Sequence, residues 1–479
     1  MLTRRTFTPA LATAALATAA LAASAPALAA QKTNVLFIAS DDLNTSLGCY
    51  GHPLVKSPNL DRLAARGTRF EHAYCNFPLC GPSRTSLLSG RRPDSTGIND
   101  NSIAVRERRL PDVITLPQMF RQAGRRAIRI GKMYHMDVPA GVGKNLFDDP
   151  PSWDEADSPP GREHNIEGER RNVTPKAGNG NNFEWVSFTG DGQHQADRVG
   201  ADRAIEFIGK NQQTPFFLGL GFVRPHVPLV APARFFDLYP LSQITPVTNP
   251  PGDRDDIPKA SEIVINTRAN DMGMNDADKR EALRGYYASI SYMDSLVGEV
   301  LAALDKAKLT ERTIVVFWSD HGWHLGEHHR WQKRSLFEES SRVPLIVSAP
   351  GMRQGQVSRG LVELVDLYPT LAELGGITPP PGFEGQSFVP LLKRPDRPWK
   401  SAVFTQMESP KEGIAGRAVR TQTHRYIRWE GPYPDEELYD LAADPREFTN
   451  LARLSQHDGL KAKLRATLDA GWQKAQAKV

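Results

Sequence analysis

Residues 34–42 read NVLFIASDD, an apolar run that ends in two acidic residues, Asp41 and Asp42. An apolar run of this length without polar alternation is typical of a strand buried on both faces of a parallel sheet. Similar runs recur at 126–130, 215–222, 313–318 and 344–347. The stretch therefore predicts one strand of a larger sheet, with carboxylates at its carboxyl end.

Helical patterns separate these runs. Residues 58–66 and 278–306 carry apolar side chains at three- and four-residue spacing. Strands that alternate with helices indicate βαβ units, so we expect an α/β fold with a large mixed, mostly parallel sheet flanked by helices. Two long segments rich in Pro, Gly and charge, 137–200 and 241–276, interrupt the pattern. Segments of this length in a compact domain are commonly the walls or lids of a site.

The last hundred or so residues follow a different pattern. The sequence ITPPPGFEG at 377–385 is a cluster of chain breakers that marks a boundary. Beyond it lie strand patterns and then an amphipathic helical pattern, at 402–406, 417–421, 426–429 and 458–475. We predict a catalytic domain over 31–380 and a smaller C-terminal α+β subdomain over 381–479.

The composition excludes several classes of protein. The chain has 479 residues, of which 40% are hydrophobic and 24% charged, as in ordinary globular proteins. A net charge of +4 gives no indication of a nucleic-acid partner. Three cysteines are too few for a disulfide scaffold.

The first thirty residues have the three parts of an export signal. Arg4 and Arg5 precede an uncharged Ala/Leu run that ends in the small-x-small cleavage pattern Ala27-Leu28-Ala29. The paired arginines resemble a twin-arginine signal. An uncleaved anchor is the alternative, but the Ala- and Thr-rich run is only weakly hydrophobic. We predict a cleaved signal over 1–30, export by the twin-arginine machinery, no integral membrane association and a periplasmic or secreted location.

Polar side chains follow two of the predicted strands. Asp41 and Asp42 follow 34–40, and Asp320 and His321 follow the run at 313–318. Ligands gather at the carboxyl ends of strands in open α/β sheets, so the four side chains are candidates for a divalent-cation site. The oxygen-rich set favours calcium or magnesium, and the histidine leaves manganese as an alternative. Capping of the following helices by the aspartates is the other interpretation.

Residues 80–90, CGPSRTSLLSG, contain a predicted helix start. Pro82 suits the first position of a helix, so Cys80 is expected just before it, facing free N–H groups and the positive end of the helix dipole. This position lowers a thiol pKa and favours an anion, and Arg84 adds a cation one turn later. A small apolar role is the alternative for Cys80, and it is the expectation for Cys49 and Cys75.

The CGPSR sequence followed by TSLLSG resembles the C-x-P-S-R signature of type I sulfatases, formylglycine-dependent members of the alkaline-phosphatase superfamily. Further family motifs accompany it in order along nearly the whole mature chain: DDLNTSLGCYG, SPNLDRLAARG, RPDSTGI, GKMYH, VRPHVP, SDHGWHLGEH, WQKRSLFEE and ELYDLAADPREFTNLA. The DDL…LGCYG, GRRPD, RPHVP and DHGW-x-LGEH motifs are most similar to the iduronate-2-sulfatase group. The resemblance implies an alkaline-phosphatase-like α/β sandwich.

The resemblance also implies a metal site and a modified nucleophile. One calcium ion per chain, with manganese or magnesium as alternatives, would be held by Asp41, Asp42, Asp320, His321 and the modified Cys80. A formylglycine-generating enzyme or equivalent maturase would convert Cys80. The hydrated aldehyde would supply a hydroxyl as nucleophile, and its second hydroxyl would allow sulfate release. Many sulfatases have asparagine in the place of His321, which leaves the identity of the metal open.

Further roles come from the resemblance alone. Asp320 would take the proton of the nucleophile, and His135 would act as the base in sulfate release. The substrate sulfate would be bound by the remaining positively charged or protonatable site residues: Arg84, Lys132, His226 and Lys333. Of these, His226 and Lys333 would also assist departure of the leaving oxygen. Without the resemblance, Lys132 and His135 would be interpreted as surface residues.

Three other features keep two interpretations each. A cluster after the metal residues is either a pocket wall or loop packing: Trp323, His324, Glu327 and His328. Side chains in the 137–200 segment either bind a sugar carboxylate or second sulfate or belong to a solvated loop: Trp153, Arg162, Arg170 and Arg171. A disulfide between Cys75 and Cys80 would block the nucleophile. Conversion of Cys80 before export would prevent this disulfide from forming.

Together these features predict an exported sulfatase (EC 3.1.6.-) that releases inorganic sulfate from a sulfated carbohydrate. A 2-O-sulfated uronate such as iduronate 2-sulfate is the leading substrate. The first alternative is a phosphonate monoester or phosphodiester hydrolase of the same superfamily, because one site can serve esters of similar shape. The second is a non-catalytic protein that binds sulfated glycans.

Overall fold

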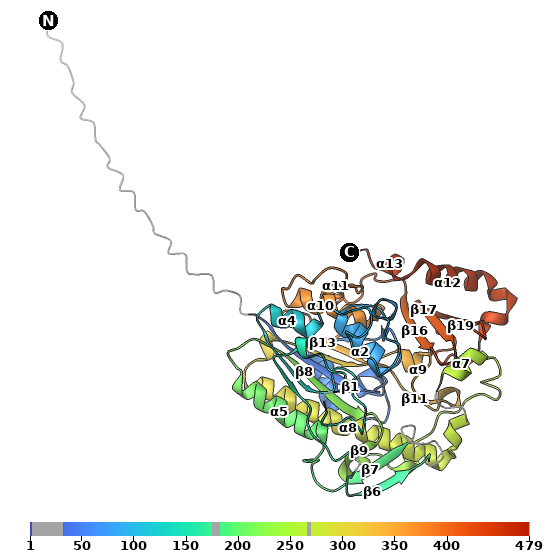
Figure 1. Cartoon of the computed structure of the whole chain (residues 1–479), viewed down its shortest axis with the longest axis horizontal. Helices are drawn as coiled ribbons and strands as arrows, with labels where there is room; N and C mark the ends of the chain where they lie inside the picture. Colours follow the sequence, from blue (N-terminus) through green and yellow to red (C-terminus); the bar gives the residue numbers. More distant parts are fainter. Residues whose placement is uncertain (2–31, 145, 164, 175–182, 266–269, 479) are drawn as a thin grey trace. The chain divides into compact units, whose positions relative to one another are not determined.

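A mixed sheet is the centre of the fold from Thr33 onward (Figure 1). The computed structural model describes residue 1 and residues 32–478, apart from 145, 164, 175–182 and 266–269. In the described residues the sheet has eight strands, in the order β14 (Gln356–Ser358), β2 (Thr68–Phe70), β13 (Leu345–Ser348), β10 (Thr313–Ser319), β1 (Asn34–Asp41), β8 (Phe216–Pro225), β4 (Arg126–Gly131) and β5 (Glu155–Asp157). The five strands from β10 to β5 are mutually parallel, whereas β13 runs antiparallel to both of its neighbours. The predicted mixed, mostly parallel α/β sheet is confirmed.

Alternate side chains of β1 face two hydrophobic layers. Leu36 and Ile38 belong to the layer that contains α1 (Pro58–Arg66), α5 (Ala196–Lys210) and α8 (Asp276–Lys306). Val35 and Phe37 belong to the layer that contains α2 (Cys80–Ser89), α4 (Leu116–Gln122), α10 (Leu367–Leu374) and α11 (Val389–Lys393). Every residue of β1 is buried, which explains why its sequence is apolar without alternation.

The long segment 137–200 contains more regular structure than its sequence predicts. It includes β5 and the strands β6 (Glu169–Asn172) and β7 (Glu184–Phe188), which join β9 (Leu229–Pro232) in a three-stranded sheet. Most of β6, with the sequence ERRN, is exposed, so no apolar alternation reveals it. Within 241–276 lies the short helix α7 (Lys259–Val264).

The C-terminal region forms a four-stranded antiparallel sheet covered by α12 (Asp458–Ala470). Its strands are β16 (Val403–Ser409), β17 (Ile414–Arg420), β18 (His424–Glu430) and β19 (Asp435–Asp440). The single helix predicted over 458–475 is wrong. The helix is interrupted at Gly471, whose φ is 78°, and the short helix α13 (Trp472–Ala475) follows. The strand β19 is rich in acidic residues, so its sequence contains no indication of a strand. The predicted boundary between a catalytic domain and a C-terminal subdomain at residue 380 stays a prediction.

The predicted signal at 1–30 lies outside the described residues except for Met1. In the part of the chain that the structure describes, no helix combines the length and apolar character needed to cross a membrane.

Candidate active site

Two residue pairs of the sequence motifs, Asp41-Asp42 and Asp320-His321, meet at the carboxyl ends of β1 and β10. These strands pair in parallel with Ser40 opposite Ser319, so the residues that follow them lie side by side. Asp41, Asp42 and Asp320 are completely buried, as is His321. Ligand atoms of Asp41, Cys80, Asp320 and His321 lie within 4.8 Å of one another, and Asp41, Asp42 and His226 form a second such set. The expected meeting of the two strand ends is observed.

Cys80 is the first residue of α2 and points its thiol into this cluster. The helix starts two residues earlier than predicted. Pro82 is still tolerated, because no N–H group in the first turn has a partner within the helix. The Cys80 Sγ lies 3.1 Å from Lys333 Nζ and 3.3 Å from His321 Nε2. Burial opposes ionisation of the thiol, but the Lys333 cation lowers the Cys80 pKa below its usual value.

The other two cysteines have the opposite electrostatics. Burial raises the pKa of Cys75 and of Cys49 well above that of a free thiol. All three cysteines are free, so Cys75 and Cys80 form no disulfide in this structure. The small apolar role expected for Cys75 agrees with its complete burial.

Three cations hold the carboxylates: Arg84 and Lys132 are buried, and Lys333 is partly buried. Lys132 Nζ donates to Asp41 Oδ2 at 2.6 Å, and Lys333 Nζ donates to Asp42 Oδ1 at 2.6 Å. Arg84 donates to Asp320 Oδ2 at 2.8 Å and to Asp41 Oδ1 at 3.3 Å. Burial opposes ionisation of Asp41, but Lys132 and its cationic neighbours hold the Asp41 pKa well below its usual value.

Arg84 is more fully engaged than its expected role as an oxyanion ligand suggests. Besides the two carboxylates, its Nη1 donates to the carbonyl oxygens of Lys132 at 2.6 Å and Met133 at 3.2 Å. With four acceptors for five N–H groups, the guanidinium fixes the positions of Asp41 and Asp320 and keeps one N–H for a ligand.

His321 has the arrangement of a metal ligand. Its Nδ1 lies 2.9 Å from the Gly322 carbonyl oxygen, which places the proton on Nδ1 and leaves Nε2 facing Asp42 Oδ1 at 3.3 Å. Ligating histidines commonly use the second nitrogen in this way. Burial disfavours the charged ring, but the Asp320 carboxylate raises the His321 pKa to about 9, so a cation that binds Nε2 displaces a proton from it.

His226 and His135 are neutral at pH 7. Burial lowers the pKa of each to about 4. His226 directs Nδ1 to the Val227 carbonyl oxygen at 2.7 Å, and its Nε2 lies 3.5 Å from Asp42 Oδ2. His135 Nε2 lies 2.9 Å from Asp137 Oδ1, so Nε2 carries the proton. Among the described residues no donor reaches the buried Nδ1 of His135, which leaves its lone pair free.

The donor set fits a hard divalent cation. Asp42 Oδ2 is buried and accepts no hydrogen bond from any residue that the structure describes. A buried carboxylate oxygen in this state indicates a missing ligand. Carboxylate oxygens with one imidazole match calcium, magnesium or manganese, so Asp41, Asp42, Asp320 and His321 fit the metal that the sequence indicates.

Three supporting residues had no role in the sequence analysis. Tyr286 on α8 donates to the carbonyl oxygen of Asp42 at 2.8 Å. Ser83 donates to the carbonyl oxygen of Asp320 at 2.5 Å, and Ser319 donates to that of His321 at 3.0 Å. The two serines lie inside the quoted motifs, whereas nothing in the helical pattern around Tyr286 points to the site.

Several candidate side chains are engaged in other contacts. Arg171 pairs with Asp278 and Glu281, and Arg170 with Glu184, as expected for a solvated loop. Arg162 is exposed and Trp153 is buried. In the cluster after the metal residues, His328 stacks on Phe337 and bonds to Asp253, His324 bonds to Ser335, and Glu327 accepts from the Leu325 N–H. These contacts match loop packing; Trp323 has its ring 5.5 Å from Lys333 Nζ.

Comparison with known proteins identifies the family. The family model for sulfatases matches residues 33–377, and the model for the C-terminal part of N-sulphoglucosamine sulphohydrolase matches residues 326–474. This chain belongs to the sulfatase family. The sulfatase is 34% identical over 462 residues to a sulfatase of Formosa agariphila, covering 92% of this chain and 88% of the relative. It is 32% identical to iduronate 2-sulfatase of Mus musculus, covering 91% and 94%.

The fold is shared with a solved structure. The structure of the phosphonate monoester hydrolase of Agrobacterium radiobacter superposes with a TM-score of 0.77 at 21% identity, covering 92% of this sulfatase and 95% of that chain. The resemblance seen in the sequence, including its similarity to iduronate 2-sulfatases, is confirmed by these matches, and the protein is a sulfatase.

Proposed function

We propose that this sulfatase is an exported, metal- and formylglycine-dependent enzyme that releases sulfate from a sulfated carbohydrate, with a 2-O-sulfated uronate such as iduronate 2-sulfate as the leading substrate. One observation carries the proposal: a thiol at the first residue of α2 lies 3.1 Å from an ammonium group and 3.3 Å from an imidazole, inside a cluster of buried carboxylates. The substrate class is supported by the similarity to iduronate 2-sulfatase.

Two groups complete the site. A maturase would convert Cys80 to an aldehyde, with an oxidant used by the maturase taking the electrons and the sulfur leaving as sulfide; the hydrate of the aldehyde would supply one hydroxyl as nucleophile and a second whose deprotonation would release sulfate. Asp41, Asp42, Asp320 and His321 hold the divalent cation, with calcium favoured by the oxygen-rich set. When bound, the cation stabilises negative charge on the nucleophile and on the sulfate oxygens.

The chain's own cations bind and orient the sulfate. Lys132 and Lys333 present ammonium groups at the cluster, and Arg84 keeps Asp41 and Asp320 in place. Asp320 is the carboxylate positioned to accept the proton of the attacking hydroxyl. Because these groups are buried and already ordered, their charges act at full strength without rearrangement during the reaction.

Departure of the sugar oxygen requires a cation or a proton donor on that side. Burial disfavours the charged form of Lys333, but Asp42 and the other anions of the site raise its pKa, so it stays positive at all working pH values. His226 is neutral in the free protein, and an incoming sulfate anion raises its pKa because negative charge stabilises the imidazolium. His226, whose Nε2 lies 3.5 Å from Asp42 Oδ2, is the proton donor proposed for this side of the site.

His135 is the base for sulfate release. Its Nδ1 lone pair has no competing donor among the described residues, and Asp137 fixes the tautomer through Nε2. A pKa of about 4 keeps the ring unprotonated at neutral pH, as a base requires.

Parallel assays separate this function from its alternatives. The experiment compares kcat/KM for an aryl sulfate and the matching aryl phosphodiester, for wild type, Cys80→Ala and the control Cys49→Ala. We expect the sulfate to be preferred, Cys80→Ala to be inactive and Cys49→Ala to match wild type. A preference for the phosphodiester would favour the phosphonate and phosphodiester hydrolase alternative. Binding of sulfated glycan without turnover by any of the three would favour the non-catalytic alternative.

The proposed location has its own test. Replacing Arg4 and Arg5 by lysine should trap the protein in the cytoplasm if the twin-arginine machinery exports it, because that machinery reads the arginine pair. Fractionation of cells that express wild type and the double variant measures this. Equal export of both would contradict the twin-arginine assignment and leave the catalytic proposal intact.

A further inference from the structure

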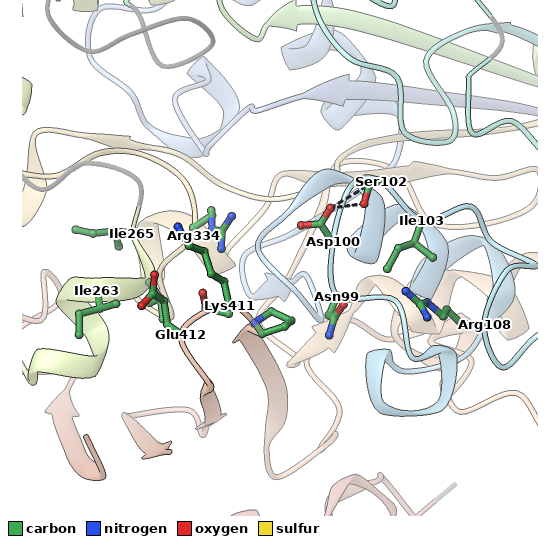
Figure 2. Close-up of a pocket in the computed structure, with 13 residues that line it drawn as sticks. Asn99, Asp100, Ser102, Ile103, Arg108, Ile263, Ile265, Arg334, Lys411 and Glu412 are labelled. Atoms are coloured by element: carbon green, nitrogen blue, oxygen red, sulfur yellow. Dashed lines mark hydrogen bonds between the residues drawn. The ribbon is translucent and has the colours of Figure 1, made fainter. Parts of the chain in front are cut away.

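A cavity of about 560 Å³ is lined by residues that include a direct sequence neighbour of the catalytic cluster, and Figure 2 shows these lining residues. Its walls come from residues 99–108, the end of α7 with Ile265, Arg334, and the turn between β16 and β17 at 409–412. In Figure 2, Arg334, Lys411 and Glu412 lie on one side of the view and Asp100 and Arg108 on the other. The volume lies within the roughly 300–1,000 Å³ of small-molecule sites.

Two walls of this cavity begin next to the reacting group. Asn101, between the lining residues Asp100 and Ser102, accepts a hydrogen bond from the Gly81 N–H at 2.8 Å. Arg334 directly follows Lys333, whose Nζ lies 3.1 Å from Cys80 Sγ. A saccharide whose sulfate ester lies at Cys80 therefore has this cavity beside it.

Arg334 presents a guanidinium group to the cavity, where the Asp100 carboxylate interacts with it electrostatically but forms no hydrogen bond or ion pair with it. Arg334 is half-buried, and no residue that the structure describes forms a hydrogen bond or ion pair with its guanidinium. Its backbone is left-handed with φ of 71°, as is that of Gln332 with φ of 75°. Left-handed backbone at a residue other than glycine costs roughly 1–2 kcal/mol and clusters at ligand-binding segments. Guanidinium groups in such sites bind carboxylate or sulfate oxygens in a bidentate manner.

The other lining groups suit a sugar that carries such an anion. Asp100 and Glu412 place carboxylates in the same walls, where they accept hydrogen bonds from hydroxyl groups. Ile103 and Ile265 provide an apolar surface for the C–H face of a ring. A compact polyanion without hydroxyl groups would be repelled by the Asp100 and Glu412 carboxylates. A sugar acid or a doubly sulfated sugar instead offers an anion to the Arg334 guanidinium and hydroxyl groups to the two carboxylates.

We propose that Arg334 determines substrate specificity by binding a second anionic group, a carboxylate or a second sulfate, on the saccharide whose sulfate ester is hydrolysed at Cys80. This proposal rests on the proposed function and adds to it the residue that recognises the second anionic group of the substrate.

The test measures charge discrimination with matched substrates. One pair is iduronate 2-sulfate and its carboxyl-reduced counterpart; the other is glucosamine 6-sulfate with and without an N-sulfate. The variants are Arg334→Gln, which removes the charge, Arg334→Lys, which keeps it, and the control Arg353→Gln, which removes an exposed charge between β13 and β14. Thermal melting of each variant accompanies the kinetics.

We expect Arg334→Gln to lower kcat/KM for the anionic member of at least one pair by about tenfold to a hundredfold more than for its neutral partner, chiefly through KM, as loss of a charge-assisted hydrogen bond requires. Arg334→Lys should restore most of the difference, and Arg353→Gln should match wild type. The pair that responds identifies the anion as a carboxylate or a sulfate. Equal losses within both pairs, or no loss in either, would overturn the role of Arg334. Hydrolysis of an aryl sulfate but of none of the four esters would overturn the role of Arg334, and hydrolysis of no sulfate ester at all would overturn the proposed function itself.

Discussion

Two buried clusters of charge in this sulfatase differ in how their carboxylates are satisfied. In the catalytic cluster (Asp41, Asp42, Asp320, Arg84, Lys132 and Lys333), Asp42 Oδ2 accepts no hydrogen bond from a described residue. In a second, structural cluster (Arg92, Glu363, Asp366 and Lys400), every carboxylate oxygen accepts at least one hydrogen bond. Both sets of carboxylates are completely or almost completely buried.

The structural cluster connects segments of the chain that are far apart in sequence. Glu363 accepts from the Phe404 N–H on β16 at 3.0 Å and from Lys400 at 2.8 Å. Burial opposes ionisation of Glu363, but Arg92 and Lys400 lower its pKa to about 2. Buried charge alone therefore does not mark a catalytic site. The catalytic cluster differs in two ways: Asp42 Oδ2 accepts no hydrogen bond from a described residue, and the nearby Cys80 thiol has its pKa lowered by the Lys333 cation.

The largest expected effect is loss of catalysis in the cluster with the unsatisfied oxygen. Asp320→Asn keeps the shape but removes a charge that Arg84 and the cation share, so we expect kcat to fall by about 1,000-fold with loss of bound metal. The measurements are metal content by mass spectrometry and turnover of an aryl sulfate. Full metal occupancy together with full activity would contradict the assignment of Asp320.

The structural cluster should show the reverse behaviour. Lys400→Met leaves Glu363 and Asp366 without their shared cation, and removing one partner of a buried ion pair costs about 3–5 kcal/mol of unfolding free energy. The exposed Lys393→Met is the matched control. Denaturant unfolding measures the loss, and kcat/KM of the folded fraction should stay within about twofold of wild type, less than 0.6 kcal/mol. If Lys400→Met unfolded like wild type but had a lowered kcat/KM, the assignment of a structural role to this cluster would be contradicted.

An intermediate effect is expected for the leaving-group side of the catalytic cluster. His226→Ala should slow alkyl sulfates by about 100-fold and 4-nitrophenyl sulfate much less, because an acidic phenol needs little protonation. Rates for a series of leaving groups in wild type and variant give this comparison directly. Equal losses across the series would exclude His226 as the proton donor.

The smallest expected effect is in the pH profile. Burial lowers the His135 pKa to about 4, so the base is free at pH 5–8 and is lost only as the pH falls through about 4. We therefore expect kcat to show no His135-dependent decline near pH 6.5. An acid limb centred at 6.5 that disappears in His135→Ala would contradict the neutral, buried state of this ring.

The sequence predicted the parts of the fold that are buried on both faces. The run at 34–40 and that at 313–318 are strands because their apolar residues serve two hydrophobic layers, and this also placed Asp41, Asp42, Asp320 and His321 at one sheet edge. Exposed elements were missed: β6 and β19 are polar, and the break at Gly471 depends on a single left-handed residue.

The catalytic site was predicted unevenly for the same physical reason. Strand ends are local features, whereas Lys132 and His135 came only from the family resemblance, and Tyr286 reaches Asp42 from a helix distant in sequence. The position of Arg334 in the cavity wall also emerges only from three-dimensional contacts, because its neighbours at 99–108 and 409–412 are remote along the chain. Tertiary contacts of this kind leave no periodic signal in the sequence.

The most direct test of the central claim is the mass of the peptide that spans Cys80, taken from purified enzyme with measured sulfatase activity. An aldehyde in place of the thiol lowers the mass of this peptide, and we predict that the converted fraction rises in proportion to specific activity across preparations. A peptide with an unmodified cysteine throughout fully active enzyme would contradict the proposed nucleophile.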